Sequence, residues 1–148
     1  DQGRVDYGKR IGEPKGLIGP ARLNGEPLER WEATPIDLRD VGAVSAMLSA
    51  QPTASVTGVA GPAFARATFD LDVVADLYLD TSGWGKGVAW SNGFNLGRYW
   101  SRGPQQTLYV PAPLLRVSGN ELLILALHAT DASSVSFVSA PNLGHTAR

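Results

Sequence analysis

The sequence has 148 residues, which is long enough for one domain with a buried core and too short for two ordinary ones. Its 13 basic and 14 acidic residues are scattered without blocks, which excludes the basic stripe of a nucleic-acid-binding surface. The absence of cysteine excludes disulfide scaffolds, zinc-cysteine sites and thiol nucleophiles, and the lack of any run of 18 apolar residues predicts no membrane span.

Most of the chain alternates apolar and polar residues in short runs broken by Gly, Pro, Asn and Asp, which is typical of strands. One segment, 40–50, has helical spacing instead: Asp40 can cap it, and Val41, Val44 and Leu48 would share one face. Many short strands with one helix predict an all-β fold, an antiparallel sandwich or barrel. The expected strands are 17–23, 29–34, 64–71, 75–80, 86–92, 95–100, 107–111, 120–129 and 134–138.

Domain boundaries follow from composition. The first residues lack the apolar stretch of a signal peptide, so we expect none in this chain, and nothing indicates a compartment. The segment 51–61 is rich in small residues and reads as a connector. We therefore expect an N-terminal segment at 1–40, a helix and connector at 41–61, a sandwich at 62–140 and a tail at 141–148.

The strand predicted at 120–129 is apolar on both faces. A half-exposed antiparallel strand would alternate with polar residues. This strand is therefore either central and covered on both sides, or one of its faces meets another domain. Its two apolar sets are Leu122, Ile124 and Ala126, and Leu123, Leu125 and Leu127.

The dipeptide Asn92-Gly93 predicts a tight hairpin, because both central residues of a type I′ turn need positive φ. On the strand that precedes it, Val88 and Trp90 would share one face. The nearby GWGKG (83–87) lacks the spacer and the Ser or Thr of a phosphate-binding loop, so we expect no phosphate site there.

Three of the four tryptophans lie between residues 79 and 100. Rings on sandwich strands usually pack in a core or between domains. A sugar platform is the alternative, and it would need an exposed ring beside polar groups that bind hydroxyls. The residues that would supply such a platform are Trp84, Asn92, Asn95, Arg98 and Trp100.

The sequence offers little for catalysis. The only histidines, His128 and His145, have no partners spaced as in a triad or a transition-metal site, and no cofactor is expected. Structural calcium remains compatible with the sequence, because loop carboxylates and carbonyls bind it without fixed spacing. Glycoside hydrolysis needs two carboxylates, but the candidates lie at predicted strand ends, where turn chemistry explains them. They are Asp70, Asp72, Asp76 and Asp80.

Several segments resemble the C-terminal region of glycoside hydrolase family 35 β-galactosidases, in order and spacing. They are GRVDYGKRIGEPKGLIGPARLNGEPLERW (3–31), PAFARATFDLDVVADLYLD (62–80), LDTSGWGKGVAWSNGFNLGRYW (79–100), GPQQTLYVPAPLL (103–115) and NELLILAL (120–127). The resemblance implies an all-β, jelly-roll, galactose-binding-like sandwich. In the family, two catalytic glutamates lie on a (β/α) barrel that this chain does not contain.

The resemblance therefore implies a non-catalytic piece that braces the barrel of a retaining β-galactosidase and contributes to binding of galactose-containing carbohydrate. In this interpretation Val88, Trp90, Phe94, Leu96 and Tyr99 build the sandwich and its contacts. Two alternatives remain: an autonomous carbohydrate-binding module that recognises galactosides or plant polysaccharide, and a purely structural assembly domain. The expected partners are the barrel and a galactoside, with no nucleic acid and no membrane.

Two motif positions carry further expectations from the family. In the GRVNYG-like segment, here GRVDYG, Tyr7 would reach towards bound galactose, with Arg4 as a structural support and Asp6 in place of the common Asn. Before the Asn-Gly turn, the family usually has Val or Ile where this chain has Ser91. A buried, unpaired hydroxyl there would cost about 1–3 kcal/mol, so Ser91 should be exposed or its packing should differ.

Overall fold

The computed structural model describes residues 18–52 and 57–144. The chain divides into two compact units, Asp1–Ile36 and Asp37–Arg148, which are described separately. Within residues 18–52 and 57–144, no helix combines the length and the hydropathy needed to cross a membrane.

The described part of the first unit contains one short hairpin. Strand β1 (Arg22–Leu23) pairs antiparallel with β2 (Glu26–Pro27). Asn24 and Gly25 form the turn with φ of 51° and 87°, the positive values that an Asn-Gly pair adopts at low cost. The sequence prediction was wrong here in two respects: of the described residues 18–23 of the strand expected at 17–23 only the last two pair, and 29–34 forms no strand.

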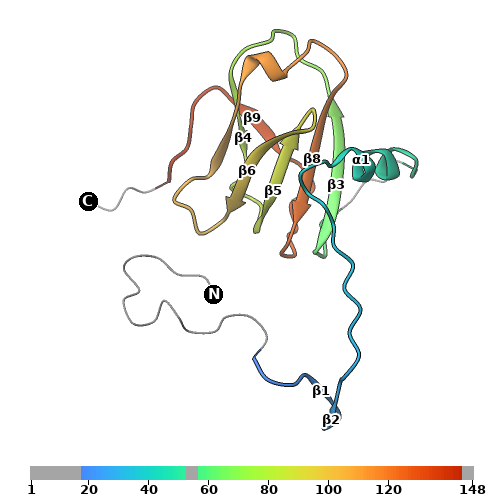
Figure 1. Ribbon diagram of the computed structural model, residues 1–148. Coiled ribbons are helices and arrows are strands. Elements are labelled where there is room, and N and C mark those ends of the chain that lie inside the picture. Colours follow the sequence, from blue (N-terminus) through green and yellow to red (C-terminus); the bar gives the residue numbers. More distant parts are fainter. Residues whose placement is uncertain (1–17, 53–56, 145–148) are drawn as a thin grey trace. The chain divides into compact units, whose positions relative to one another are not determined.

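The second unit is an antiparallel β-sandwich, which confirms the predicted fold class (Figure 1). Its four-stranded sheet has the order β3-β8-β5-β6, and its three-stranded sheet has the order β7-β4-β9. The elements are α1 (Gly42–Ser49), β3 (Ala63–Phe69), β4 (Leu77–Asp80), β5 (Lys86–Ser91), β6 (Phe94–Trp100), β7 (Thr107–Val110), the 3-10 helix η2 (Ala112–Leu114), β8 (Asn120–Ala126) and β9 (Ser136–Val138).

The main core lies between the two sheets. Because successive strand residues point to opposite faces, each strand contributes every second side chain to this layer. Leu79 and Val110 of the three-stranded sheet are completely buried against Leu122 and Ile124 of the four-stranded sheet. Trp84 and Tyr99 close the layer with their rings at 86° and their centroids 6.4 Å apart.

A second, smaller core covers part of the outer face of the four-stranded sheet. Helix α1 packs Val44 and Leu48 beside Val41, onto Trp90 and Leu123. The face predicted for this helix is thus confirmed. Asp40 accepts a hydrogen bond from the N–H of Gly42 at 2.8 Å, although the residue that caps the helix is Val41.

A polar anchor fixes α1 to the sheet. The hydroxyl of Ser45, on α1, donates to the Glu121 carboxylate on β8 at 2.6 and 2.7 Å. The same carboxylate accepts a hydrogen bond from Arg66 of β3, also at 2.6 Å, in a partly buried salt bridge. Helix and both strands are therefore tied at one end of the outer face.

The position of strand β8 in the sheet explains why it is apolar on both faces. It lies between β3 and β5, so both of its edges are paired. Leu122, Ile124 and Ala126 face the other sheet, and Leu123 lies under α1. Further along the outer face the cover ends: Leu125 is half-buried and Leu127 is 40% exposed. The structure confirms the first alternative, a central strand covered on both sides, for most of its length. A contact of the exposed part with another domain stays a prediction.

The β5–β6 hairpin has the predicted turn, with φ of 49° at Asn92 and 80° at Gly93. Its register shifts by one residue beyond Trp90, because Ala89 pairs with Gly97 and leaves Leu96 as the extra residue of a β-bulge. Phe94 was expected to build the sandwich and its contacts; it is 51% exposed because it follows directly on the turn, so it adds little to the core.

Candidate functional site

The tryptophans predicted as a sugar platform occupy different environments. Trp84 is 5% exposed, and its indole N–H donates to the Ser134 carbonyl at 3.0 Å. It lines a recess of only about 110 Å³, below the usual size of a ligand pocket. Trp100 is partly exposed on β6, on the opposite side of the four-stranded sheet. The structure does not bring these two rings together.

The two asparagines of the predicted platform also differ. The Asn92 amide is used within the fold: it donates to the carbonyls of Leu114 and Asn120, and accepts from the N–H of Glu121. Asn95 is exposed on β6, and its side-chain carbonyl accepts from the N–H of Gly97, which supports the bulge. Asn95 keeps its amide N–H groups on the surface, and Asn92 does not.

Trp100 stands at the centre of a cluster of three cations. The Nζ atom of Lys86 lies 4.8 Å from the ring centroid, and the guanidinium carbons of Arg98 and Arg102 lie 5.5 and 5.7 Å from the ring. Lys86 is the cross-strand partner of Trp100. Of these residues the sequence predicted Trp100 and Arg98; Lys86 and Arg102 were missed.

An open, polar hollow of about 620 Å³ adjoins this cluster at the end of β6. Arg102 belongs to both, and the N–H of Gly103 donates to the Trp100 carbonyl at 2.8 Å. The N–H of Gln106 donates to the Asn142 carbonyl on the far wall, which fixes the hollow's two sides. Its lining residues are Ser101, Arg102, Gly103, Pro104, Gln106, Asn142 and Gly144.

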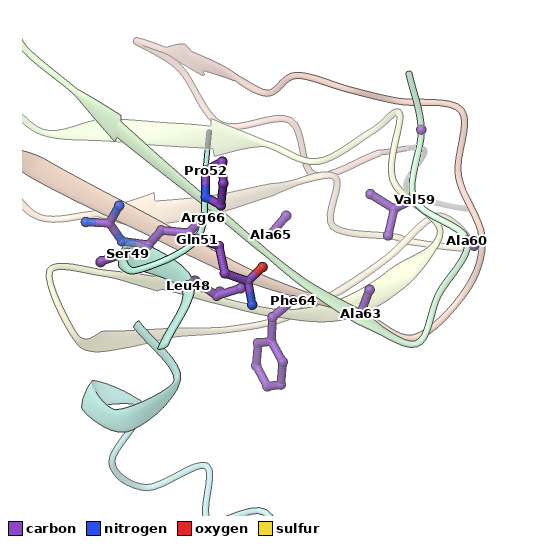
Figure 2. Close-up of a pocket in the computed structure, with 11 residues that line it drawn as sticks. Leu48, Ser49, Gln51, Pro52, Val59, Ala60, Ala63, Phe64, Ala65 and Arg66 are labelled. Atoms are coloured by element: carbon purple, nitrogen blue, oxygen red, sulfur yellow. The ribbon is translucent and has the colours of Figure 1, made fainter. Parts of the chain in front are cut away.

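A second hollow, of about 410 Å³, lies between the end of α1 and β3 (Figure 2). Phe64 and Arg66 line it from β3, and Gln51 and Pro52 line it from the segment after the helix. The Arg66 guanidinium is already paired with Glu121, so this hollow offers no free charge from that side chain. Residues 53–56, which connect two of its lining segments, lie outside the described residues.

The three-stranded sheet exposes a pair of tyrosines on its outer face. Tyr78 and Tyr109 are cross-strand partners with ring centroids 5.5 Å apart. The Asp76 carboxylate accepts a hydrogen bond from the Tyr109 hydroxyl, which raises the pKa of Tyr109 above its usual value. Asp76 also accepts from the N–H of Ala112 at 2.8 Å, so its main role is to hold a turn.

Two of the other carboxylates suspected from the sequence serve turns as predicted, and for the third, Asp72, the described residues show no such hydrogen bond. Asp70 accepts from the N–H of Gly119, and Asp80 accepts from the N–H of Ser82. Among the described residues no three His, Cys, Asp or Glu side chains are grouped as a metal site. His128 is exposed just beyond β8. Arg4, Asp6, Tyr7 and His145 lie outside the described residues.

Comparison with known proteins supplies the family. Residues 62–120, from the start of the sandwich to the first residue of β8, match the family model described as the galactose-binding domain of β-galactosidase. A β-galactosidase of Xanthomonas manihotis is 37% identical over 119 residues, which cover 80% of this chain and 19% of that protein. Beta-galactosidase 17 of Arabidopsis thaliana is 37% identical over 143 residues, covering 87% and 20%.

A mammalian relative extends the match over nearly the whole chain. The β-galactosidase of Macaca fascicularis is 35% identical over 169 aligned positions, which cover 97% of this chain and 24% of that protein. The chain thus spans 19–24% of the length of these relatives. It belongs to the β-galactosidase family, as a C-terminal region that includes the family's galactose-binding domain.

Proposed function

We propose that this chain is a non-catalytic β-sandwich domain of a retaining β-galactosidase, which packs against the catalytic barrel and braces it. The observation that carries the proposal is an apolar area on the outer face of the four-stranded sheet. This area, called the open face, consists of Phe64, Val88, Leu125 and Leu127. Helix α1 covers the neighbouring end of the same sheet face.

The open face has the chemistry of a domain contact. Three of its four side chains, Phe64, Val88 and Leu125, pack against the buried Trp90 and Leu123. A partner would therefore extend an existing core and would not have to create a new one. Burial of apolar surface contributes about 25 cal/mol per Å². Interfaces between domains of one chain typically bury roughly 600–1,500 Å². A contact centred on these four residues would therefore stabilise both partners.

The carboxylates support a non-catalytic role. A retaining glycosidase needs two carboxyl groups about 5–5.5 Å apart, one of them free to act as nucleophile. Asp70, Asp76 and Asp80 each accept a hydrogen bond from a backbone N–H, which is the chemistry of a turn. We assign the nucleophile and the acid/base to the barrel of the parent enzyme.

The experiment expresses the barrel of the parent enzyme as a tagged chain together with the 148-residue chain. Co-purification in equal amounts is expected, with hydrolysis of a nitrophenyl galactoside by the pair and none by the 148-residue chain. Val88→Asp combined with Leu125→Asp should abolish retention, because two charges would be buried in the contact. The matched control is Val73→Asp, since Val73 is 73% exposed on a loop. Unchanged retention of the double variant would refute the bracing role.

A second candidate is an autonomous module that binds neutral galactosides. The observation in its favour is the position of Trp100, partly exposed beside a hollow with polar walls, with Asn95 and Arg98 on the same strand. It predicts saturable binding of galactose or a galacto-oligosaccharide by the isolated chain, weakened by Trp100→Ala. Calorimetry without a heat of binding for any of these sugars would remove this candidate.

A further inference from the structure

The cations around Trp100 form a cluster beside the open face, because Arg98 is the cross-strand partner of Val88. The bracing contact as proposed uses only the apolar residues of that face and none of these cations. Three cations approach the Trp100 indole. Lys86 lies on the facing strand β5, and Arg98 and Arg102 lie two residues before and two residues after Trp100 in the sequence. Each cation–π contact contributes roughly 0.5–1 kcal/mol at an exposed site. The ring therefore gathers three positive side chains at one place on the outer face.

These three charges have no carboxylate partner of their own in residues 18–52 and 57–144. The salt bridges of that part of the chain are Arg39–Asp37 and Arg66–Glu121, and neither includes one of the three cations. Like charges held this close repel one another. An anion bound among them would relieve the repulsion, and guanidinium groups bind carboxylate or sulfate in a bidentate fork.

The adjoining hollow presents groups that recognise sugar hydroxyls. Ser101, Gln106 and Asn142 line it, and its volume of about 620 Å³ falls within the range of ligand pockets. Each amide also makes one bond within the fold: Gln106 donates to the Ser101 carbonyl at 3.4 Å, and the Asn142 side-chain carbonyl accepts from the N–H of Gly144. The Ser101 hydroxyl and the remaining donors and acceptors of the two amides are the groups offered to a ligand. Arg102 lines the hollow and also contacts Trp100. One molecule can therefore reach the cations and the hydroxyl-binding groups together.

We propose that the end of β6 binds an acidic saccharide, with its carboxylate or sulfate held by Lys86, Arg98 and Arg102 and its hydroxyls in the polar hollow. This goes beyond the bracing role, which uses the open face. A neutral sugar would not relieve the repulsion among the three charges. An acidic protein surface would satisfy the charges but would gain little from a concave wall of hydroxyl and amide groups.

The test titrates the 148-residue chain calorimetrically with three probes of equal length. They are a trigalacturonate, a neutral galactotriose and a sulfated galactan trisaccharide. At least one acidic probe should bind about tenfold more tightly than the neutral one, and its affinity should fall as salt rises from 20 to 200 mM, because exposed charges are screened. The two acidic arms distinguish carboxylate from sulfate as the preferred anion.

Substitutions locate the site. Arg102→Gln should weaken the acidic probe about tenfold, since it removes a charge shared by cluster and hollow, and Arg98→Gln should weaken it about fivefold. Trp100→Phe keeps an aromatic ring, so the variant should fold. It should weaken binding of the acidic probe less than Arg102→Gln does. The matched control is Arg116→Gln, because Arg116 is exposed beyond the 3-10 helix, towards the opposite end of the sandwich.

Two results would overturn the proposal. Equal affinity for acidic and neutral probes would show that the charges do not select the ligand, and would favour the neutral galactoside module. If neither acidic probe binds, the cluster does not bind an acidic saccharide, and an acidic protein surface becomes its expected partner. Neither result bears on the bracing role, which rests on retention of the barrel.

Discussion

The side-chain amide of Asn92 donates a hydrogen bond to the side-chain carbonyl of Asn120 at 3.0 Å, and so joins the β5–β6 turn to the start of β8. Asn120 is completely buried. Its carbonyl also accepts from the N–H of Arg116, and its amide donates to the carbonyls of Arg116 and Phe69. One buried amide thus connects a hairpin turn, a loop and the end of β3.

Replacing Asn120 by Ala should destabilise the sandwich by about 2–4 kcal/mol. The substitution removes four hydrogen bonds and leaves polar groups of the turn and loop unpaired in a dry environment. Each unpaired group costs about 1–3 kcal/mol, and relaxation of the loop reduces the total. Urea unfolding followed by tryptophan fluorescence measures the loss. Ser118→Ala, on the same loop but exposed, should change stability by less than about 0.5 kcal/mol. Equal effects of both variants would contradict the role of this network.

Ser91 offers the opposite outcome, a stabilising substitution. Its hydroxyl is completely buried and has no hydrogen-bond partner. Of the two alternatives for this residue, exposure is therefore excluded and a local difference in packing stays open, and the position carries a desolvation cost. Ser91→Ala should raise the free energy of unfolding by about 1 kcal/mol, because it removes an unpaired polar atom from the core. Thermal unfolding measures the change, with Ser82→Ala on an exposed turn as the neutral control. A loss of stability would mean that the hydroxyl is hydrogen-bonded in solution.

The β-bulge in β6 is a feature of the fold that the sequence pattern did not predict. The period-2 pattern located the seven sandwich strands, and Asn92-Gly93 fixed the turn, because both signals are local. A regular hairpin from that turn would pair Lys86 with Tyr99. The extra residue at Leu96 moves the register by one and brings Lys86 opposite Trp100 instead.

The cation cluster was therefore only partly predictable. Asn95 and Gly97 carried a signal for the bulge, since Gly97 adopts a φ of 115° and its N–H is held by the Asn95 side chain. A lone glycine in a strand also fits a packing role, so this signal does not determine the register. The polar hollow depends on the loop 101–106 lying beside Asn142, a contact between segments that local pattern does not encode.

Gly87 should tolerate no side chain. A Cβ atom there would overlap the Leu125 carbonyl oxygen and the Tyr99 hydroxyl, which meet at a hydrogen bond of 3.1 Å. Because the Leu125 oxygen belongs to the backbone of β8, the overlap can be relieved only if β5 and β8 move apart. Gly87→Ala should therefore cost at least about 3 kcal/mol or prevent folding. Circular dichroism and urea unfolding measure the effect. Gly83→Ala is the matched control, since its Cβ would only touch the Ala132 side chain, 3.7 Å away. A stable Gly87→Ala protein would refute the β5–β8 register.

Tyr99 should give the sandwich a pH dependence at alkaline pH. Burial raises the pKa of its hydroxyl to about 12, above the value of about 10 for an unfolded chain. Below pH 10 the phenol is protonated in both states, and its contribution to stability is fully present. Between about pH 10 and 12 the unfolded state releases the proton first, so the free energy of unfolding falls, by on the order of 1–3 kcal/mol in all.

The Tyr99→Phe variant separates this effect from general alkaline unfolding. It loses the hydrogen bond to the Leu125 carbonyl, so at pH 8 it should be less stable than the natural chain by about 1 kcal/mol. That difference should shrink by pH 11, because the variant has no buried phenol to ionise. Leu108→Ala, which weakens the same core without a titratable group, should keep a constant deficit across this range. Urea unfolding at pH 8, 10 and 11 distinguishes the two patterns, and a constant deficit for Tyr99→Phe would show that the hydroxyl ionises alike in the folded and unfolded states.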